Sequence, residues 1–237
     1  MVRGKSDTVD ARFISKYGWM RREELIPMKV VNDAQIELQQ LMNHRDKLVA
    51  DKASYQSKLK EMQLQMGDNL NEKMVQSIQF VMQVLAQEVK ETEKSIKDLI
   101  GKDEALQSNY ELMTSVTGIG FATAIHLLIV TDNFSRFNDV RKLMCYCGVA
   151  PFTHQSGTSI RGKKRVSHLA NKKIKSLLTM AAISAIQHDP VLKAKYEQKV
   201  KEGKPKMSVI NIIRAKLLER IFAVIKNQKM YEIRIAA

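Results

Sequence analysis

The chain has 237 residues and a hydrophobic share of 44%, which is ordinary for one or two packed globular units. No apolar run reaches the roughly 18 residues of a transmembrane helix, and the first residues lack the apolar core of a signal peptide. The net charge is +14, because residues 1–110 carry 17 basic and 17 acidic side chains while residues 111–237 carry 22 and 8. A polyanion is the simplest partner for so basic a second half, and an idle basic surface is the alternative.

Cysteine usage indicates a reducing compartment. Cys145 and Cys147 are the only cysteines, their spacing is not that of a redox motif, and no second pair completes a zinc site. We expect a cytoplasmic protein in which both thiols are buried as small hydrophobic groups, and a nucleoid-associated one where the polyanion partner is DNA.

Residues 1–31 form a short mixed segment with two acids near its start. Asp7 and Asp10 are three positions apart, so at a helix start both carboxylates can face one side and help to hold Mg²⁺. The alternative is helix capping, because acids at a helix N-terminus stabilise the helix dipole. The residues alone favour capping, since two carboxylates make a weak metal site.

Residues 32–102 are predicted to form an antiparallel coiled-coil hairpin. In the first run, apolar residues recur every seven positions, at Leu41, Leu48, Tyr55 and Met62. After a break at residues 67–69, a second run has apolar residues at three- and four-residue steps and ends at Gly101. Arg45 and Lys52 interrupt the first stripe, so a helical pair inside a bundle is the alternative. Either arrangement predicts architecture or assembly into a homo-oligomer.

Residues 103–237 are predicted to form a compact basic domain of mostly short helices, so the fold class is mainly α. The clearest helical patterns cover residues 121–130, 140–147, 172–187 and about 207–226. Residues 152–163 hold Gly157 and Gly162 and have the composition of a loop.

Gly118-Ile119-Gly120 separates two helical stretches, as in a helix-hairpin-helix. The glycines allow a sharp turn close to a phosphate, and the following helix offers free N–H groups and a positive dipole end. Such an element grips the nucleic-acid backbone without reading its sequence. The alternative is a C-cap glycine in an ordinary interhelical turn. The basic residues downstream favour phosphate binding through Gly118 and Gly120.

Ser156 lies beside Gly157 and precedes a basic cluster. A serine hydroxyl on a loop can attack a scissile phosphate, and nearby cations would stabilise the transition state. The alternative is a plain Ser-Gly turn, with cations that only contact phosphates. His154 has no visible orienting group, and His126, in an apolar helix, is interpreted as a core residue. The predicted backbone track consists of Arg161, Lys163, Lys164, Arg165, Asn171, Lys172 and Lys173.

Three sequence blocks stand in a distinctive order. They are KSDTVDA at residues 5–11, the stretch from TSVTGIG to YCGVAP at residues 114–151, and the stretch from QSG to VSHLANKK at residues 155–173. In order and spacing they resemble the DEDD transposases of insertion sequences, the one-hundred-and-ten family, which are relatives of the Piv DNA invertases. Thr117 and Ala170 replace a proline and a glycine that are usual there.

The resemblance implies a domain order and a mechanism. The family has an RNase-H-like (RuvC-like) domain with four acids, a coiled coil, and a C-terminal transposase domain with a nucleophilic serine. Asp7 and Asp10 match the last two acids and are implied Mg²⁺ ligands, and Ser156 matches the serine. The implied reaction is strand cleavage through a phosphoserine link, followed by strand exchange. DNA is the implied partner, in some members with a structured guide RNA, and several protomers assemble.

The chain start departs from this pattern. Residues 1–31 match the end of the RuvC-like domain, and the strands that bear the first two acids would precede Met1. We therefore expect a truncated, non-autonomous transposase, with residues 32–102 as the coiled coil and 103–237 as the transposase domain. The alternatives are a non-enzymatic helical nucleic-acid-binding protein and a coiled-coil interaction protein with an incidental basic tail.

Overall fold

The computed structural model describes residues 6–25, 33–67, 70–152, 155–156, 160–161, 165–166 and 169–233. Contacts divide the chain into two compact units, Met1–Asp33 and Ala34–Ala237. The described residues are mainly helical, which confirms the predicted fold class. Among them, every helix is too short or too polar to span a bilayer.

The first unit contains α1 (Asp7–Met20). Ser6 caps this helix, because its hydroxyl accepts a hydrogen bond from the backbone N–H of Val9 at 3.4 Å. Asp7 and Asp10 both lie in the first turn, and no residue of α1 is buried within its unit.

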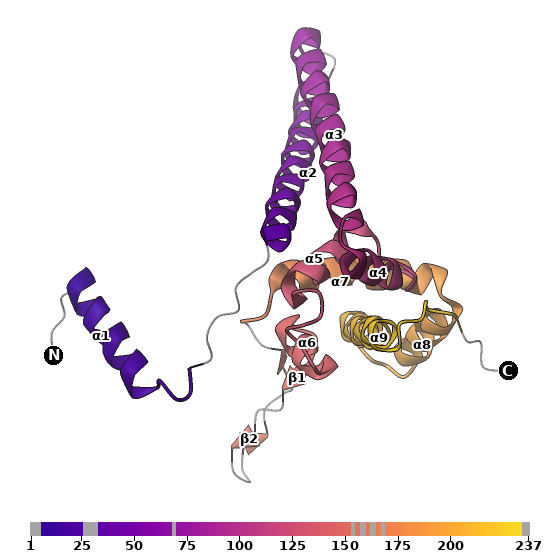
Figure 1. Ribbon diagram of the computed structural model, residues 1–237. Coiled ribbons are helices and arrows are strands. Elements are labelled where there is room, and N and C mark those ends of the chain that lie inside the picture. The colour runs from indigo at the N-terminus through magenta and orange to yellow at the C-terminus, as the bar shows by residue number, and fades with distance from the viewer. Residues whose placement is uncertain are drawn as a thin grey trace. The chain divides into compact units, whose positions relative to one another are not determined.

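The second unit begins with two long helices, α2 (Asp33–Met66) and α3 (Glu72–Gly101), which lie side by side in Figure 1. Their adjoining ends share apolar contacts, since Leu38 and Met42 of α2 and Ile96 of α3 belong to the buried core. The arginine that interrupts the apolar stripe has a facing partner. Arg45 donates to Glu93 Oε1 from Nε at 3.0 Å and from Nη2 at 2.8 Å. The charged position therefore links the two helices.

Six further helices pack together beyond the end of α3 (Figure 1). They are α4 (Glu104–Thr114), α5 (Phe121–Thr131), α6 (Val140–Tyr146), α7 (Lys172–His188), α8 (Pro190–Lys201) and α9 (Lys206–Asn227). The helix α7 is central, because it contacts α5, α8 and α9. Its buried face includes Ile174, Leu178 and Ala182. Burial raises the pKa of the Cys147 thiol to about 12, whereas Cys145 is only half-buried.

Between α6 and α7 the chain forms two short antiparallel strand pairs. β1 (Pro151–Phe152) pairs with β4 (Arg165–Val166), and β2 (Gln155–Ser156) pairs with β3 (Ile160–Arg161). We call the four strands β1–β4 together the serine hairpin. The prediction of a loop over residues 152–163 is therefore wrong in part. Antiparallel pairing provides hydrogen-bond partners for backbone N–H and C=O groups where the chain reverses direction. Strands of two residues are too short to show the alternation of apolar and polar side chains by which a strand is predicted from sequence.

Candidate nucleic-acid interface

Gly118 lies at the closest approach between the α4–α5 turn and α7. Its φ is +93°, a conformation that L side chains rarely adopt. A Cβ atom there would stand 2.5 Å from the Ala181 carbonyl oxygen and 2.8 Å from Ala185 Cβ. Glycine is therefore required both by the backbone angle and by the contact with α7.

Gly120 occupies a different environment at the start of α5. It is the exposed N-cap residue of α5, and no side chain caps this helix end. The first N–H groups of an α-helix have no partner within the helix and carry partial positive charge. The ammonium of Lys97, from α3, lies 5.8 Å from the centroid of the Phe121 ring. Backbone amides and a cation thus gather at one helix end, which is an arrangement suited to a phosphate.

A hollow of about 400 Å³ adjoins this helix end. It is lined by Lys97, Ile100, Gly101, Gln107 and Tyr110. The ring of Tyr110 packs edge-on against that of Phe121, with 6.3 Å between the centroids. No local sequence pattern pointed to Lys97, because its place beside this helix end depends on how α3 packs against α5.

The serine hairpin positions the backbone of Ser156. In β2, Ser156 is paired with Ile160, and the preceding Gln155 is paired with Arg161. For Ser156, Arg161 and Arg165, the structure describes the backbone alone. The remaining predicted members of this segment, Lys163 and Lys164, lie outside the described residues, as does His154.

Asn171 fixes the point where the chain enters α7. Its Oδ1 accepts a hydrogen bond from the N–H of Ile174 at 3.0 Å, which caps the helix. Its own N–H donates to the Tyr146 carbonyl oxygen at 2.9 Å, and its Nδ2 donates to the Tyr146 hydroxyl at 3.3 Å. Asn171 thereby joins the start of α7 to the end of α6. Lys172 and Lys173 follow in the exposed first turn.

Asp46 connects the long helices to the basic helices. Its Oδ2 lies 2.8 Å from Lys173 Nζ and 2.9 Å from His126 Nε2, and its Oδ1 lies 3.5 Å from Arg45 Nη1. Lys173, predicted to contact nucleic acid, is therefore paired with a carboxylate. His126 is buried and has a polar partner, as expected for a core histidine.

This cluster changes the titration of two of its members. Burial raises the pKa of Asp46, but the hydrogen bond from Lys173 and the positive charges around it outweigh burial, so the pKa is lowered. Burial lowers the pKa of His126, and Asp46 offsets this only in part, so that pKa is also lowered. His126 is therefore mainly neutral at pH 7, while Asp46 is ionised.

Asp7 and Asp10 are exposed on the first turn of α1. Within the described ranges, no three His, Cys, Asp or Glu residues come together in a way that could hold a metal ion. Mg²⁺ takes six ligands in octahedral geometry, so two carboxylates on one turn supply only part of its coordination shell. By themselves these residues do not make a complete magnesium site.

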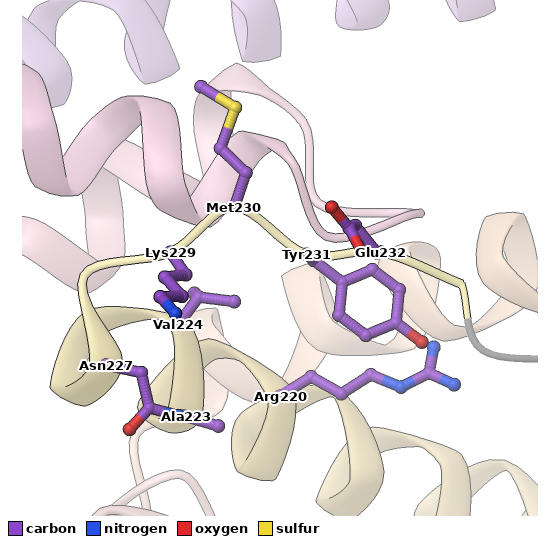
Figure 2. Close-up of a pocket in the computed structure, with 8 residues that line it drawn as sticks. All are labelled: Arg220, Ala223, Val224, Asn227, Lys229, Met230, Tyr231 and Glu232. Atoms are coloured by element: carbon purple, nitrogen blue, oxygen red, sulfur yellow. The ribbon is translucent and has the colours of Figure 1, made fainter.

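A cavity of about 790 Å³ lies at the end of α9, and Figure 2 shows the residues that line it. The Arg220 guanidinium lies 4.6 Å from the centroid of the Tyr231 ring, and its Nη1 is 2.5 Å from Oδ2 of the buried Asp189. The charge of Arg220 is therefore compensated, and no predicted site residue lines this cavity.

Comparisons with known proteins match most of the chain. A family model described as "Transposase IS116/IS110/IS902 family" matches residues 110–197, which include Gly118, Ser156 and Lys173. A second model, described as "Transposase" and built on DEDD transposases of the IS110 type, matches residues 2–66, which include Asp7 and Asp10.

Individual relatives agree with the family models. The pilin gene-inverting protein of Moraxella lacunata is 26% identical over 237 residues, covering 99% of this chain and 70% of the relative. The protein of the same name from Moraxella bovis matches at the same identity and coverage. The insertion element IS110 uncharacterized 43.6 kDa protein of Streptomyces coelicolor is 28% identical over 126 residues, which is 53% of this chain and 31% of that protein.

Proposed function

Since the chain belongs to the IS110 family of transposases, we propose that it cleaves and rejoins DNA strands with Ser156 as the nucleophile. The observation that carries this proposal is the match of residues 110–197 to the transposase model, because that range contains the serine hairpin and the basic start of α7. The family models describe transposases, and the name of the Moraxella relatives describes the inversion of a pilin gene, so DNA transposition or recombination is the activity proposed here.

The proposed chemistry has two balanced steps. In the first, Ser156 Oγ loses its proton and bonds to phosphorus, the bond from phosphorus to one deoxyribose oxygen breaks, and that oxygen leaves as a protonated hydroxyl. In the second, a hydroxyl of another strand attacks the phosphoserine and releases the serine. Negative charge builds on the phosphoryl oxygens in both steps, and Arg161, Lys163, Lys164 and Arg165 are proposed to stabilise it.

DNA is proposed to lie along the exposed start of α5 and the start of α7. The amides after Gly120 and the ammonium of Lys97 are suited to one phosphate, and Lys172 to another. Lys173 needs to leave Asp46, or to be shared with it, before it contacts a phosphate. These contacts are to the sugar-phosphate backbone and do not read the base sequence. A structured guide RNA is therefore proposed as a further partner that selects the DNA sequence.

Asp7 and Asp10 are proposed to contribute two carboxylates to a Mg²⁺ site in the assembled protein. Mg²⁺ would neutralise charge on the phosphate under attack. Assembly into a homo-oligomer is proposed to run through the long helices. In support, α3 exposes 66% of Phe80 and 45% of Val84, two apolar residues one turn apart.

A covalent trap tests the nucleophile. To supply the first two acids that the family resemblance implies, the chain is fused behind the corresponding segment of a family transposase. The fusion is incubated with Mg²⁺ and supercoiled DNA that carries the genomic sequences flanking the coding region, and adducts are separated under denaturing conditions. We expect an alkali-labile protein–DNA adduct that Ser156→Ala abolishes, while DNA affinity changes less than about twofold. The matched controls are Ser159→Ala and Ser167→Ala, which should leave the adduct intact.

The outcome also decides between the enzyme and a non-enzymatic nucleic-acid-binding protein. An adduct that persists in Ser156→Ala would contradict the assigned nucleophile. The Asp7→Asn, Asp10→Asn double variant should lose the adduct and keep DNA binding, because those residues are proposed to act on the metal and not on affinity. If neither the wild type nor any variant forms an adduct, yet DNA affinity falls steeply with salt, the binding protein is the better description.

A further inference from the structure

Arg214, in α9, is a buried cation without an acidic partner among the described residues. Its side chain is 5% exposed. Its Nη2 donates to Thr179 Oγ1 at 2.7 Å and its Nη1 to Asn211 Oδ1 at 3.2 Å, while its Nε has no hydrogen-bond partner within the described part of the chain. Both acceptors are neutral, so they do not offset the charge. Burial accordingly lowers the pKa of this guanidinium.

The sequence around Arg214 explains the missing counter-ion. Between Asp139 and Asp189 there is no aspartate or glutamate, and this stretch contains α6, the serine hairpin and α7. In α9 itself, Glu219 is the one acid, and it pairs with Lys216 at 2.5 Å. A buried charge without a partner is costly, and α6, the serine hairpin and α7 contain no acid that could offset the charge of Arg214.

Lys175 is a second cation, one helical turn from the Thr179 that bonds Arg214. Within α7, Thr179 Oγ1 donates to the Lys175 carbonyl oxygen at 2.8 Å. A Cβ atom built on Gly148 would be 3.8 Å from Lys175 Nζ, so the ammonium stands beside Gly148. No carboxylate lies within ion-pair distance of Lys175 among the described residues.

Both cations are tied to the segment that leads into the serine hairpin. Asn211, which accepts from Arg214, donates from Nδ2 to the Val149 carbonyl oxygen at 2.8 Å. Val149 follows Gly148 and precedes the first strand of the hairpin by two residues. Lys175 and the Arg214–Asn211 pair therefore meet at Gly148–Val149, the root of the hairpin that carries Ser156.

We propose that Lys175 and Arg214 form a phosphate-binding site at the root of the serine hairpin. The half-buried Lys175 makes the direct contact with the phosphate. Arg214 is a positioning residue: its buried charge adds positive potential, and through Asn211 it holds the Val149 carbonyl oxygen in place. The ligand is a phosphodiester of the DNA strand being processed, which rests on the proposed function. Free inorganic phosphate has the same chemistry and serves as the probe.

The first experiment measures thermal unfolding of the whole chain while sodium phosphate replaces sodium chloride at constant ionic strength. The wild type should gain several degrees in Tm with phosphate. Lys175→Gln and Arg214→Met should each lose most of that gain, and Arg214→Lys should restore it, because the charge returns. Lys216→Gln is the matched control: it removes a cation that already has a carboxylate partner and should leave the gain intact.

The second experiment separates DNA from free phosphate as the source of the ligand. For a short duplex, the slope of log K against log salt should fall by about one unit in Lys175→Gln, as expected for one lost phosphate contact. Ser156→Ala should leave both the phosphate gain and the salt slope unchanged, so failure of the nucleophile is distinguishable from failure of this site.

A phosphate gain that Lys175→Gln abolishes, with an unchanged DNA slope, identifies a free-phosphate site and overturns the DNA assignment. An equal Tm for the wild type in phosphate and chloride, together with an unchanged slope in Lys175→Gln, overturns the proposal altogether. If Arg214→Met fails to fold, Lys175→Gln and Arg214→Lys still give both readouts.

Discussion

Gly118 and Gly120, separated by one residue, have different structural roles in the α4–α5 turn. Gly118 has a positive φ and touches α7, whereas Gly120 is exposed, has a β-region backbone and has open space where a side chain would stand. The sequence predicted the turn and its glycines from their spacing. It did not distinguish these duties, because the contact partner of Gly118 lies more than sixty residues further along the chain.

Substituting the two glycines should separate fold from contact. Gly118→Ala should destabilise the chain by roughly 2 to 4 kcal/mol, since it combines a left-handed backbone with an overpacked contact. Gly120→Ala should cost about 1 kcal/mol or less, because alanine is a poorer N-cap but fits. Denaturant unfolding of both variants measures the difference, and equal losses would mean that the turn does not press on α7 as described.

At the scale of elements, the Asp46 cluster joins α2, α5 and α7, and Arg45 extends it to Glu93 of α3. An aspartate that accepts from both a histidine and a lysine holds the long helices against the basic ones. Because the pKa values of His126 and Asp46 are both lowered, the unfolded chain binds more protons than the folded chain in acid. Stability therefore declines as pH falls.

The pH dependence can be assigned to its groups. The contribution of His126 is present above its ordinary pKa of 6.5 and is lost as pH falls below it, and that of Asp46 is lost below 3.8. His126→Gln should flatten the decline in Tm between about pH 7 and 5 and leave the more acidic part. The exposed His44, changed to Gln, is the control. A profile that His126→Gln leaves unaltered would show that the cluster does not govern acid stability.

The elements that could be predicted from the sequence are those with a local apolar pattern. The apolar faces of α3, α7 and α9 repeat at the helical period, and α5 is apolar along most of its length, so local patterns were enough to place these helices within about a turn. The helix α8 buries only Leu192, and so it has no stripe to detect, although Asp189 caps it and Pro190 starts it. The contacts between Asp46 and His126, and between Asn211 and Val149, join residues far apart in sequence, which no local pattern encodes.

At the scale of the whole molecule, charge is distributed unevenly. The basic excess belongs to the part of the chain after α3, while the long helices are close to neutral. Exposed apolar side chains occur in both parts, for example Phe80 on α3 and Met180 on α7. The charge division is consistent with a polyanion that meets the part after α3. The sequence predicted this division from charge counts. Residue types alone raised Ser156 and Asp7 as candidates beside plainer alternatives, and only the family resemblance favoured them as site residues.

Assembly is testable at this scale. Phe80→Glu places a charge in the exposed apolar pair Phe80 and Val84 on α3. It should lower the molar mass from that of an oligomer toward that of the 27.0 kDa monomer. Light scattering after gel filtration measures this mass. Gln83→Glu adds the same charge beside this pair and should not change the mass. An unchanged mass in Phe80→Glu would place any self-association elsewhere on the chain.

The length of α2 gives it the geometry of a lever arm. Asp46 lies in its first half, and the remaining twenty residues extend roughly 30 Å beyond it. If this helix tilts as a rigid rod, a displacement of its distal tip becomes a smaller shift of the Asp46 carboxylate relative to Lys173. We therefore expect tension or docking at the tip to alter the Asp46–Lys173 ion pair, two residues after Asn171, without direct contact with the serine hairpin.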